Sequence, residues 1–157
     1  MIRRLLLPLL LLCNPAPVQA IERGAFLSLL HRSGVSVIER RHCGTEHNNV
    51  AAYYYNRNSI CISTRNTHNQ QMVDRALTHE TVHAIQDCLG GQHNGDLQEI
   101  SHTAGVSINN FSSRLPASTL AMIRSSYPRY MWDVEIEAYA LEGRPDDVAE
   151  LLTMSCS

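Results

Sequence analysis

Apolar residues recur at helical spacing over most of the chain. The longest such stretch has Asn69 placed to cap its start and Gly90-Gly91 placed to end it. We therefore expect a mostly helical protein, in which the long central helix is rigid enough to present side chains at fixed spacing. The helical patterns cover residues 21–32, 70–89, 97–103, 116–127, 128–142 and 146–154.

Strand patterns are confined to the region ahead of the long helix. Residues 35–39 form a short strand candidate, and residues 50–55 and 59–64 flank Asn56-Arg57-Asn58, which is typical of a hairpin turn. We expect an α+β fold with a small antiparallel sheet or hairpin before the 70–89 helix. The polar stretch 107–114 is expected to be a loop at the mouth of the functional site.

The first twenty residues have the layout of a secretory signal peptide. Arg3 and Arg4 precede a short apolar run, and Val18-Gln19-Ala20 offers small residues at the positions that precede a cleavage site. We therefore divide the chain into a signal peptide, residues 1–20, and one domain, residues 21–157. This layout predicts an exported protein, either periplasmic or extracellular.

Charge and hydropathy narrow the classes of partner. Removing Arg3 and Arg4 leaves 11 basic against 15 acidic residues, a formal charge of −4, and the basic residues form no stripe. This balance argues against binding to nucleic acid. No segment after residue 20 is apolar for long enough to span a membrane, and nothing in the sequence predicts an oligomeric state.

Four cysteines remain after residue 20, and an even number in an exported chain predicts two disulfides. Three pairings are possible. We favour Cys43–Cys61, which would tie the hairpin region together, and Cys88–Cys156, which would pin the C-terminal segment to the end of the long helix. A cysteine zinc site is disfavoured because no two cysteines have C-x-x-C spacing.

The sequence His79-Glu80-Thr-Val-His83 lies inside the long helix and predicts a zinc site. Residues four apart lie on one helical face, so both imidazoles can bind one metal ion. Glu80 lies beside them and can take a proton from zinc-bound water. A histidine six residues after His83 would mark one class of such enzymes, but Leu89 occupies that position.

Catalytic zinc usually has a third protein ligand, and the 128–142 helix offers Glu135 and Glu137. On a helical projection Glu135 falls near the middle of a wide apolar arc, and Glu137 falls outside it, beside Asp133. A carboxylate in an apolar face needs a positive partner, which favours Glu135 as the ligand and keeps Glu137 in reserve. An ion pair of Glu135 with Arg124 or Arg129 is the alternative.

The segment Leu77-Thr-His-Glu-x-x-His-Ala-x-x-Asp-Cys88, followed by Glu135-Ile136-x-Ala138, resembles the metallopeptidases of the mitochondrial intermembrane space that help assemble ATP synthase. More broadly it resembles glutamate zincins, and over roughly residues 43–156 the chain resembles small exported bacterial metallopeptidase domains. The resemblance implies a minimal zincin-like fold with Glu135 as the third ligand. It departs from the pattern at Tyr139, where many glutamate zincins have the Asp or Asn that orients a metal histidine.

These features predict a zinc metallopeptidase with one zinc ion per chain and a peptide or protein substrate. A further hydrogen-bond donor is expected in the site, and His93, His102, Tyr130 and Tyr139 are candidates, although surface or packing roles are more common for such residues. The strand expected at 59–64 is a candidate edge for aligning an extended peptide. The alternatives are a non-enzymatic zinc-binding domain and an enzyme that hydrolyses a non-peptide amide.

Overall fold

The computed structural model describes residues 21–44, 49–66 and 68–156. The expected signal peptide lies outside these residues, as does the middle of the polar loop after Cys43. The elements, in chain order, are α1 (Arg23–Arg32), β1 (Ser36–Arg40), β2 (Ala51–Tyr54), η1 (Tyr55–Arg57), β3 (Ser59–Ser63), η2 (Thr64–Asn66), α2 (Gln70–Leu89), α3 (Ile100–Ala104), α4 (Asn109–Ser112), α5 (Ala117–Ser126), η3 (Arg129–Met131), α6 (Trp132–Leu141) and α7 (Pro145–Ser155). The expected α+β class is confirmed.

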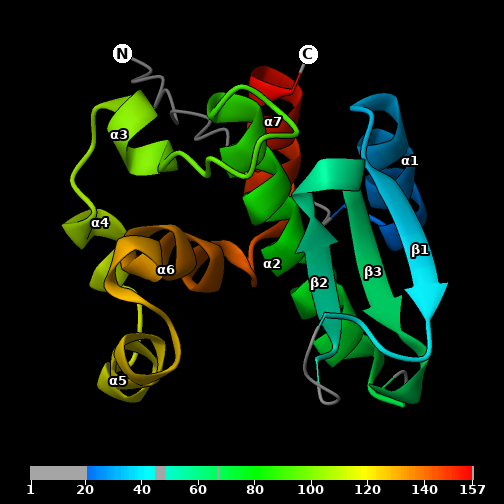
Figure 1. Ribbon diagram of the computed structural model, residues 1–157, viewed down its shortest axis with the longest axis horizontal. Helices are drawn as coiled ribbons and strands as arrows, with labels where there is room; N and C mark the ends of the chain where they lie inside the picture. The colour runs from blue at the N-terminus through cyan, green and yellow to red at the C-terminus, as the bar shows by residue number, and fades with distance from the viewer. Residues whose placement is uncertain (1–20, 45–48, 67, 157) are drawn as a thin grey trace, which may run out of the picture.

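Helix α2 is the centre of the molecule, with the sheet on one side and α6 on the other (Figure 1). It begins after Asn69, whose side-chain oxygen accepts a hydrogen bond from Met72 N at 3.1 Å, and thus caps the helix as expected. It ends before Gly90, where an added Cβ would lie 1.6 Å from the carbonyl oxygen of Asp96. Glycine at this position lets the following loop fold back against the helix end.

The strands of the described residues form a three-stranded mixed sheet in the order β1-β3-β2. Strands β2 and β3 form the expected antiparallel hairpin, but β1 pairs with β3 in parallel. The expected hairpin is confirmed, and the sheet as a whole is mixed because the chain crosses over after β1 to place β3 in the centre. Strand β3 is not an edge, and β2 is the edge strand beside α2.

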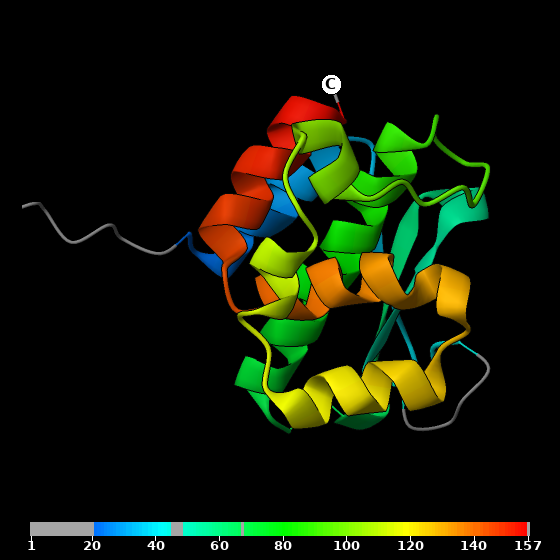
Figure 2. The ribbon, with the colours of Figure 1, turned by 90° about the vertical axis from the view of Figure 1, so that its left-hand side faces the viewer.

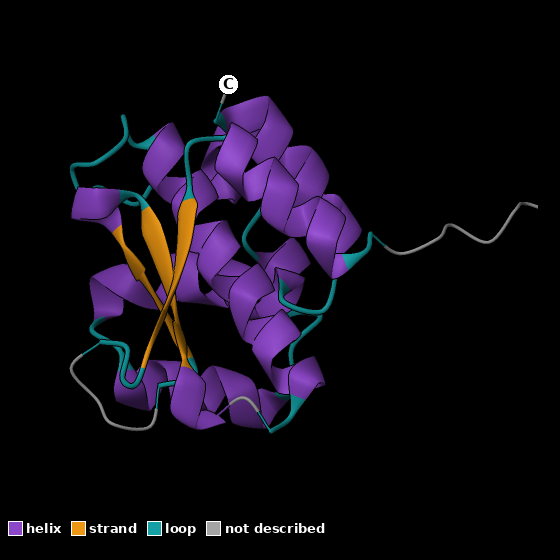
Figure 3. Cartoon of the chain, turned by 90° about the vertical axis from the view of Figure 1, so that its right-hand side faces the viewer, coloured by secondary structure: helices purple, strands orange, loops and turns teal. Residues whose placement is uncertain are grey.

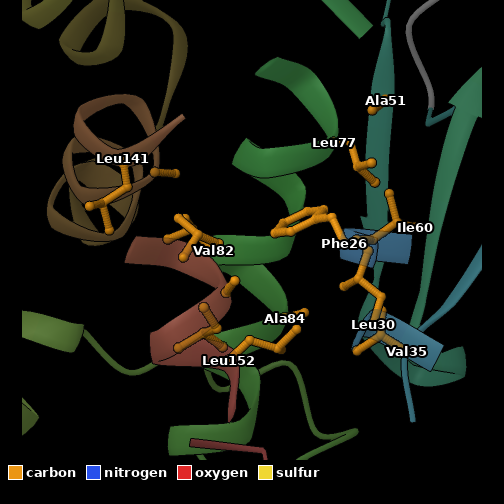
Figure 4. Packing of buried hydrophobic residues seen from close by; sticks show 14 of the residues in the cluster. Phe26, Leu30, Val35, Ala51, Ile60, Leu77, Val82, Ala84, Leu141 and Leu152 are labelled. Atoms are coloured by element: carbon orange, nitrogen blue, oxygen red, sulfur yellow. The ribbon is translucent and has the colours of Figure 1, made fainter. Parts of the chain in front are cut away.

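One face of the sheet packs against α1 and α2. Ile60 and Ile62 of β3 join Phe26, Leu30 and residues of α2 in the hydrophobic core (Figure 4). Cys61 lies between the two isoleucines and points to the opposite face, where it is joined to Cys43. Figure 3 shows the twist of the three strands beside the helices.

The C-terminal helices cover the rest of α2. Helix α6 crosses it on one side and α7 packs along it, and Figure 2 shows α6 between α7 and α5. The second expected disulfide, Cys88–Cys156, joins the ends of α2 and α7. The stretch 107–114 was expected to be a loop, but α4 forms within it because Phe111 is buried in the core. No described helix is long and apolar enough to cross a membrane.

Candidate metal centre

Three predicted ligands, His79, His83 and Glu135, come together between α2 and α6. The two histidines lie on successive turns of α2, and Glu135 projects toward them from the first turn of α6. Nε2 of His79 lies 3.5 Å from one carboxylate oxygen of Glu135, and Nε2 of His83 lies 3.5 Å from the other. One ligand atom from each residue lies within 4.8 Å of the other two, so the group could hold a metal ion.

The spacing of these atoms fits a small metal ion. In a tetrahedral site with bonds of about 2.1 Å, neighbouring ligand atoms lie roughly 3.4 Å apart. Glu135 is 3% exposed, and its Oε2 atom forms no hydrogen bond with the described residues. A buried carboxylate oxygen that accepts no hydrogen bond is costly. In the metal-free protein the imidazole of His79, 3.5 Å from Oε2, is its charge partner, and a metal ion would take that place.

The two arginines expected as alternative partners of Glu135 do not pair with it. Among the described residues, neither Arg124 nor Arg129 forms an ion pair with Glu135. The guanidinium of Arg124 lies 5.9 Å from the centre of the Trp132 ring. The positively charged partner that Glu135 needs on the apolar face of α6 is therefore not an arginine.

Glu137, the reserve ligand, has a different position. Its carboxylate accepts hydrogen bonds from the backbone N–H groups of Ile100 and Ser101, both at 2.8 Å, and from Gln86 Nε2 at 2.9 Å. It is 0% exposed, although the helical projection placed it outside the apolar face. The projection failed because α3 packs against that side of α6 and uses Glu137 to satisfy its first N–H groups.

The orientation of His83 is set by Gln86, one turn later on α2. The side-chain nitrogen of Gln86 donates to Val134 O at 3.0 Å, which leaves its oxygen to accept from Nδ1 of His83 at 2.8 Å. With the proton on Nδ1, the lone pair of Nε2 faces Glu135. This is the tautomer that a metal-binding imidazole needs. The spacing of three residues is a helical signal that the sequence interpretation missed.

His79 is oriented by Glu142, which the sequence interpretation also missed. Oε2 of Glu142 lies 3.4 Å from Nδ1 of His79, and Glu142 also pairs with Arg75. Tyr139, which occupies the position of the orienting Asp or Asn in the resemblance, instead packs its ring edge-to-face on His79, with 4.6 Å between centroids. Glu142 is seven residues after Glu135, so two helical turns bring both carboxylates to one side of α6.

The carboxylates control the charge of His79 in the metal-free protein. Burial alone would lower the pKa of His79, but Glu135 and Glu142 outweigh it and raise the pKa to about 10. Burial likewise acts to raise the pKa values of Glu135 and Glu142, yet His79 holds both below their usual range. In the absence of metal, a charged imidazole therefore sits between two carboxylates.

Of the three clustered residues, His79 lines a cleft of about 590 Å³. Glu80 lines this cleft next to His79, and its Oε2 accepts a hydrogen bond from the backbone N–H of Tyr53 at 2.8 Å. The hydroxyl of Tyr53 bonds to Asp87 at 2.9 Å, so the edge strand β2 is tied to α2 at both points. The lining residues are Asn49, Val50, Ala51, Asn69, Gln71, Met72, Arg75, Ala76, His79, Glu80, Tyr127, Tyr139 and Glu142.

Of the four candidate donors, only Tyr139 lines the cleft. His93 and His102 are exposed elsewhere, and Tyr130 is 81% exposed. Tyr127, which no sequence pattern singled out, also lines the cleft. Burial and the nearby Glu135 raise the pKa of Tyr127, and burial chiefly raises that of Tyr139, so both phenols stay neutral and can donate. The stretch 107–114 contributes nothing to the cleft lining.

A protein-family model described as "Domain of unknown function (DUF8637)" matches residues 22–157, and the chain belongs to this family. Comparison with curated proteins and with solved structures finds no match.

Proposed function

We propose that this member of the DUF8637 family is a zinc metallopeptidase, with His79, His83 and Glu135 as ligands and Glu80 as general base. The observation that carries the proposal is the position of Glu80. It lies beside the ligand cluster and faces the cleft, yet it is not one of the three clustered residues. A metal that only stabilised the fold would need neither an open cleft nor a carboxylate at this point.

The donor set supports zinc as the metal. Two neutral imidazoles and one carboxylate form a ligand type that is common in catalytic zinc sites, with one position left for water or substrate. The cleft supplies access to that position. One ion per chain is expected, since the described residues bring these ligands together once.

The chain's own groups are placed for peptide hydrolysis. At such a site zinc acts as a Lewis acid, which makes water more acidic and polarises a substrate carbonyl. Glu80 can accept the proton of the attacking water and pass it to the leaving amine. Tyr127 and Tyr139 line the same cleft as neutral phenols, and they can donate to the oxygen on which negative charge develops.

The wall of the cleft supports a peptide as substrate. Val50 and Ala51, at the start of the edge strand β2, line it, and an edge strand can pair with an extended chain. The expected signal peptide and the two disulfides support export to the periplasm or the cell exterior, where peptides are available as substrates.

The test compares Glu80→Gln with Glu150→Gln, a matched change at an exposed carboxylate of α7. The oxidised chain beginning at Ile21 is loaded with zinc and incubated with a peptide library, and cleavage is followed by mass spectrometry. We expect about one zinc per chain in all three proteins, and cleavage to fall at least 100-fold only in Glu80→Gln. Cleavage that survives in Glu80→Gln, or a wild type that binds zinc without cleaving peptides, would overturn the proposal.

A further inference from the structure

The start of the described chain is held by a residue far away in sequence. The backbone nitrogen of Ile21 donates to Oδ1 of Asp146 at 2.6 Å, across a separation of 125 residues. Asp146 lies in the first turn of α7, and the side chain of Ile21 packs against the hydrophobic core. The first residue after the expected signal peptide is therefore docked on the start of the last helix.

Hydrolysis of the Ala20–Ile21 bond would change the chemistry of this contact. A signal peptidase adds water to the bond, so that Ala20 leaves as a carboxylate and Ile21 keeps an amine. That amine takes up a proton at neutral pH. A peptide N–H thus becomes an ammonium group on the same atom, 2.6 Å from a carboxylate oxygen.

We propose that Asp146 is the binding site for the α-ammonium group of the processed chain. Salt bridges stronger than ordinary surface pairs need short distances and restricted partners, and both conditions hold here. Ile21 and Asp146 are both partly buried, and Ile21 is fixed by its packing.

The arginines near Asp146 pair with other carboxylates, so Asp146 remains able to bind the ammonium group. Arg23 pairs with Asp74 at 2.8 Å, and Arg144 pairs with Asp147. Asp146 forms no ion pair with an arginine in the part of the chain that the structure describes. The partner of its carboxylate is the nitrogen of Ile21.

Processing then stabilises the fold directly. The precursor keeps a neutral N–H at Asp146, and cleavage adds a positive charge to the same nitrogen. The exported, cleaved chain is therefore more stable than the precursor. This inference does not depend on the proposed function, because the contact lies outside the ligand cluster and needs neither zinc nor substrate.

The amino-acid composition allows the α-amino group of Ile21 to be probed chemically without interference from other amines. Residues 21–157 contain no lysine, so the α-amino group of Ile21 is the single primary amine of the processed chain. Acylating reagents attack the unprotonated, accessible form of an amine. Intact-mass spectrometry after a short exposure at pH 7.5 therefore reports on this one group.

Two forms of the chain are compared, one beginning at Ile21 and one carrying Ala20 as an extra first residue. Each is made with Asp146, with Asp146→Asn, and with Asp147→Asn as the matched control from the same helical turn. Metal-free thermal unfolding gives the melting temperature, at low salt and at 1 M NaCl. The Ala20 form keeps a neutral N–H at position 21 and carries its ammonium group one residue further from Asp146.

We expect the Ile21 form to melt about 2–4 °C above the Ala20 form when Asp146 is present, with the difference smaller at 1 M NaCl. Asp146→Asn should remove this difference and speed acylation of Ile21 several-fold, whereas Asp147→Asn should do neither. Equal melting temperatures of the two forms, or a difference that persists in Asp146→Asn, would overturn the proposal. If Asp146→Asn fails to fold, the comparison of the two forms with Asp146 still decides.

Discussion

Oε2 of Glu142 lies 3.4 Å from Nδ1 of His79, the ring nitrogen opposite the one that faces Glu135. A carboxylate at this place fixes the ring and strengthens Nε2 as a ligand. The residue expected in this role was position 139, one turn after Glu135, where Tyr139 packs on the ring instead. The chain thus orients His79 from a position two turns after Glu135.

Replacing Glu142 with glutamine should weaken metal binding without preventing it. The amide keeps the size of the side chain but loses the charge that orients His79, and such changes typically reduce metal affinity 10- to 100-fold. Competition with a chromophoric zinc chelator measures this affinity. Glu150→Gln, an exposed change on α7, is the control. An unchanged affinity in Glu142→Gln would show that the contact has no part in metal binding.

Replacing Glu135 and replacing Glu137 should have opposite effects on metal binding and on stability. Glu135→Ala removes a ligand, so we expect the protein to fold and to lose its bound metal. Glu137→Ala leaves two N–H groups of α3 and the amide of Gln86 without their acceptor, which should cost about 3 kcal/mol of unfolding free energy. Its folded fraction should still hold about one ion per chain.

Urea unfolding and elemental analysis of metal content measure these two effects. Loss of metal in Glu137→Ala with unchanged stability would reverse the assignment of the two residues.

Metal affinity should continue to rise above neutral pH. The pKa of His79 is about 10 in the metal-free protein, so a proton competes with the metal, and each pH unit between 7 and 9 should raise the apparent affinity about tenfold. A histidine with an ordinary pKa near 6.5 would give a plateau above pH 7. Chelator competition at several pH values distinguishes the two outcomes.

The raised pKa of His79 also predicts how the stability of the metal-free protein depends on pH. A raised pKa means that protonated His79 stabilises the folded state, and this contribution is fully present below pH 6.5 and is lost as the pH rises through about 10. Glu142→Gln removes one of the carboxylates that raise the pKa, so both the plateau in metal affinity and the loss of stability should move to lower pH.

The features that depend on residue spacing within one element were predicted correctly from the sequence. The bounds of α2, the Asn69 cap and the pair of histidines on one face all follow from the helical repeat. Both disulfides are the pairings favoured from the sequence, one tying the hairpin region and one pinning the C-terminal segment to the end of α2. Glu135 was singled out by the cost of a carboxylate in an apolar face, and it lies in the ligand cluster.

The errors arose where one element meets another. Glu137 looks solvent-exposed on a projection of α6 alone, but α3 covers it and uses its oxygens. The parallel pairing of β1 with β3 has no signature in either strand, since register between distant strands depends on the packed core. Tyr127 reaches the cleft from the segment after α5, where its backbone oxygen is held by Trp132, and no periodic pattern marks this position.

The hydrogen bond from Tyr53 N–H to Glu80 has a consequence for any chain that enters the cleft. Strand β2 is an edge strand, and this N–H is one of the donors that an added strand would use. A peptide laid along β2 would meet a donor that is already engaged by the carboxylate. Under the proposed function, a bound peptide and Glu80 would therefore compete for this one N–H donor, and a peptide that accepted its hydrogen bond would free Glu80 to turn toward the scissile bond.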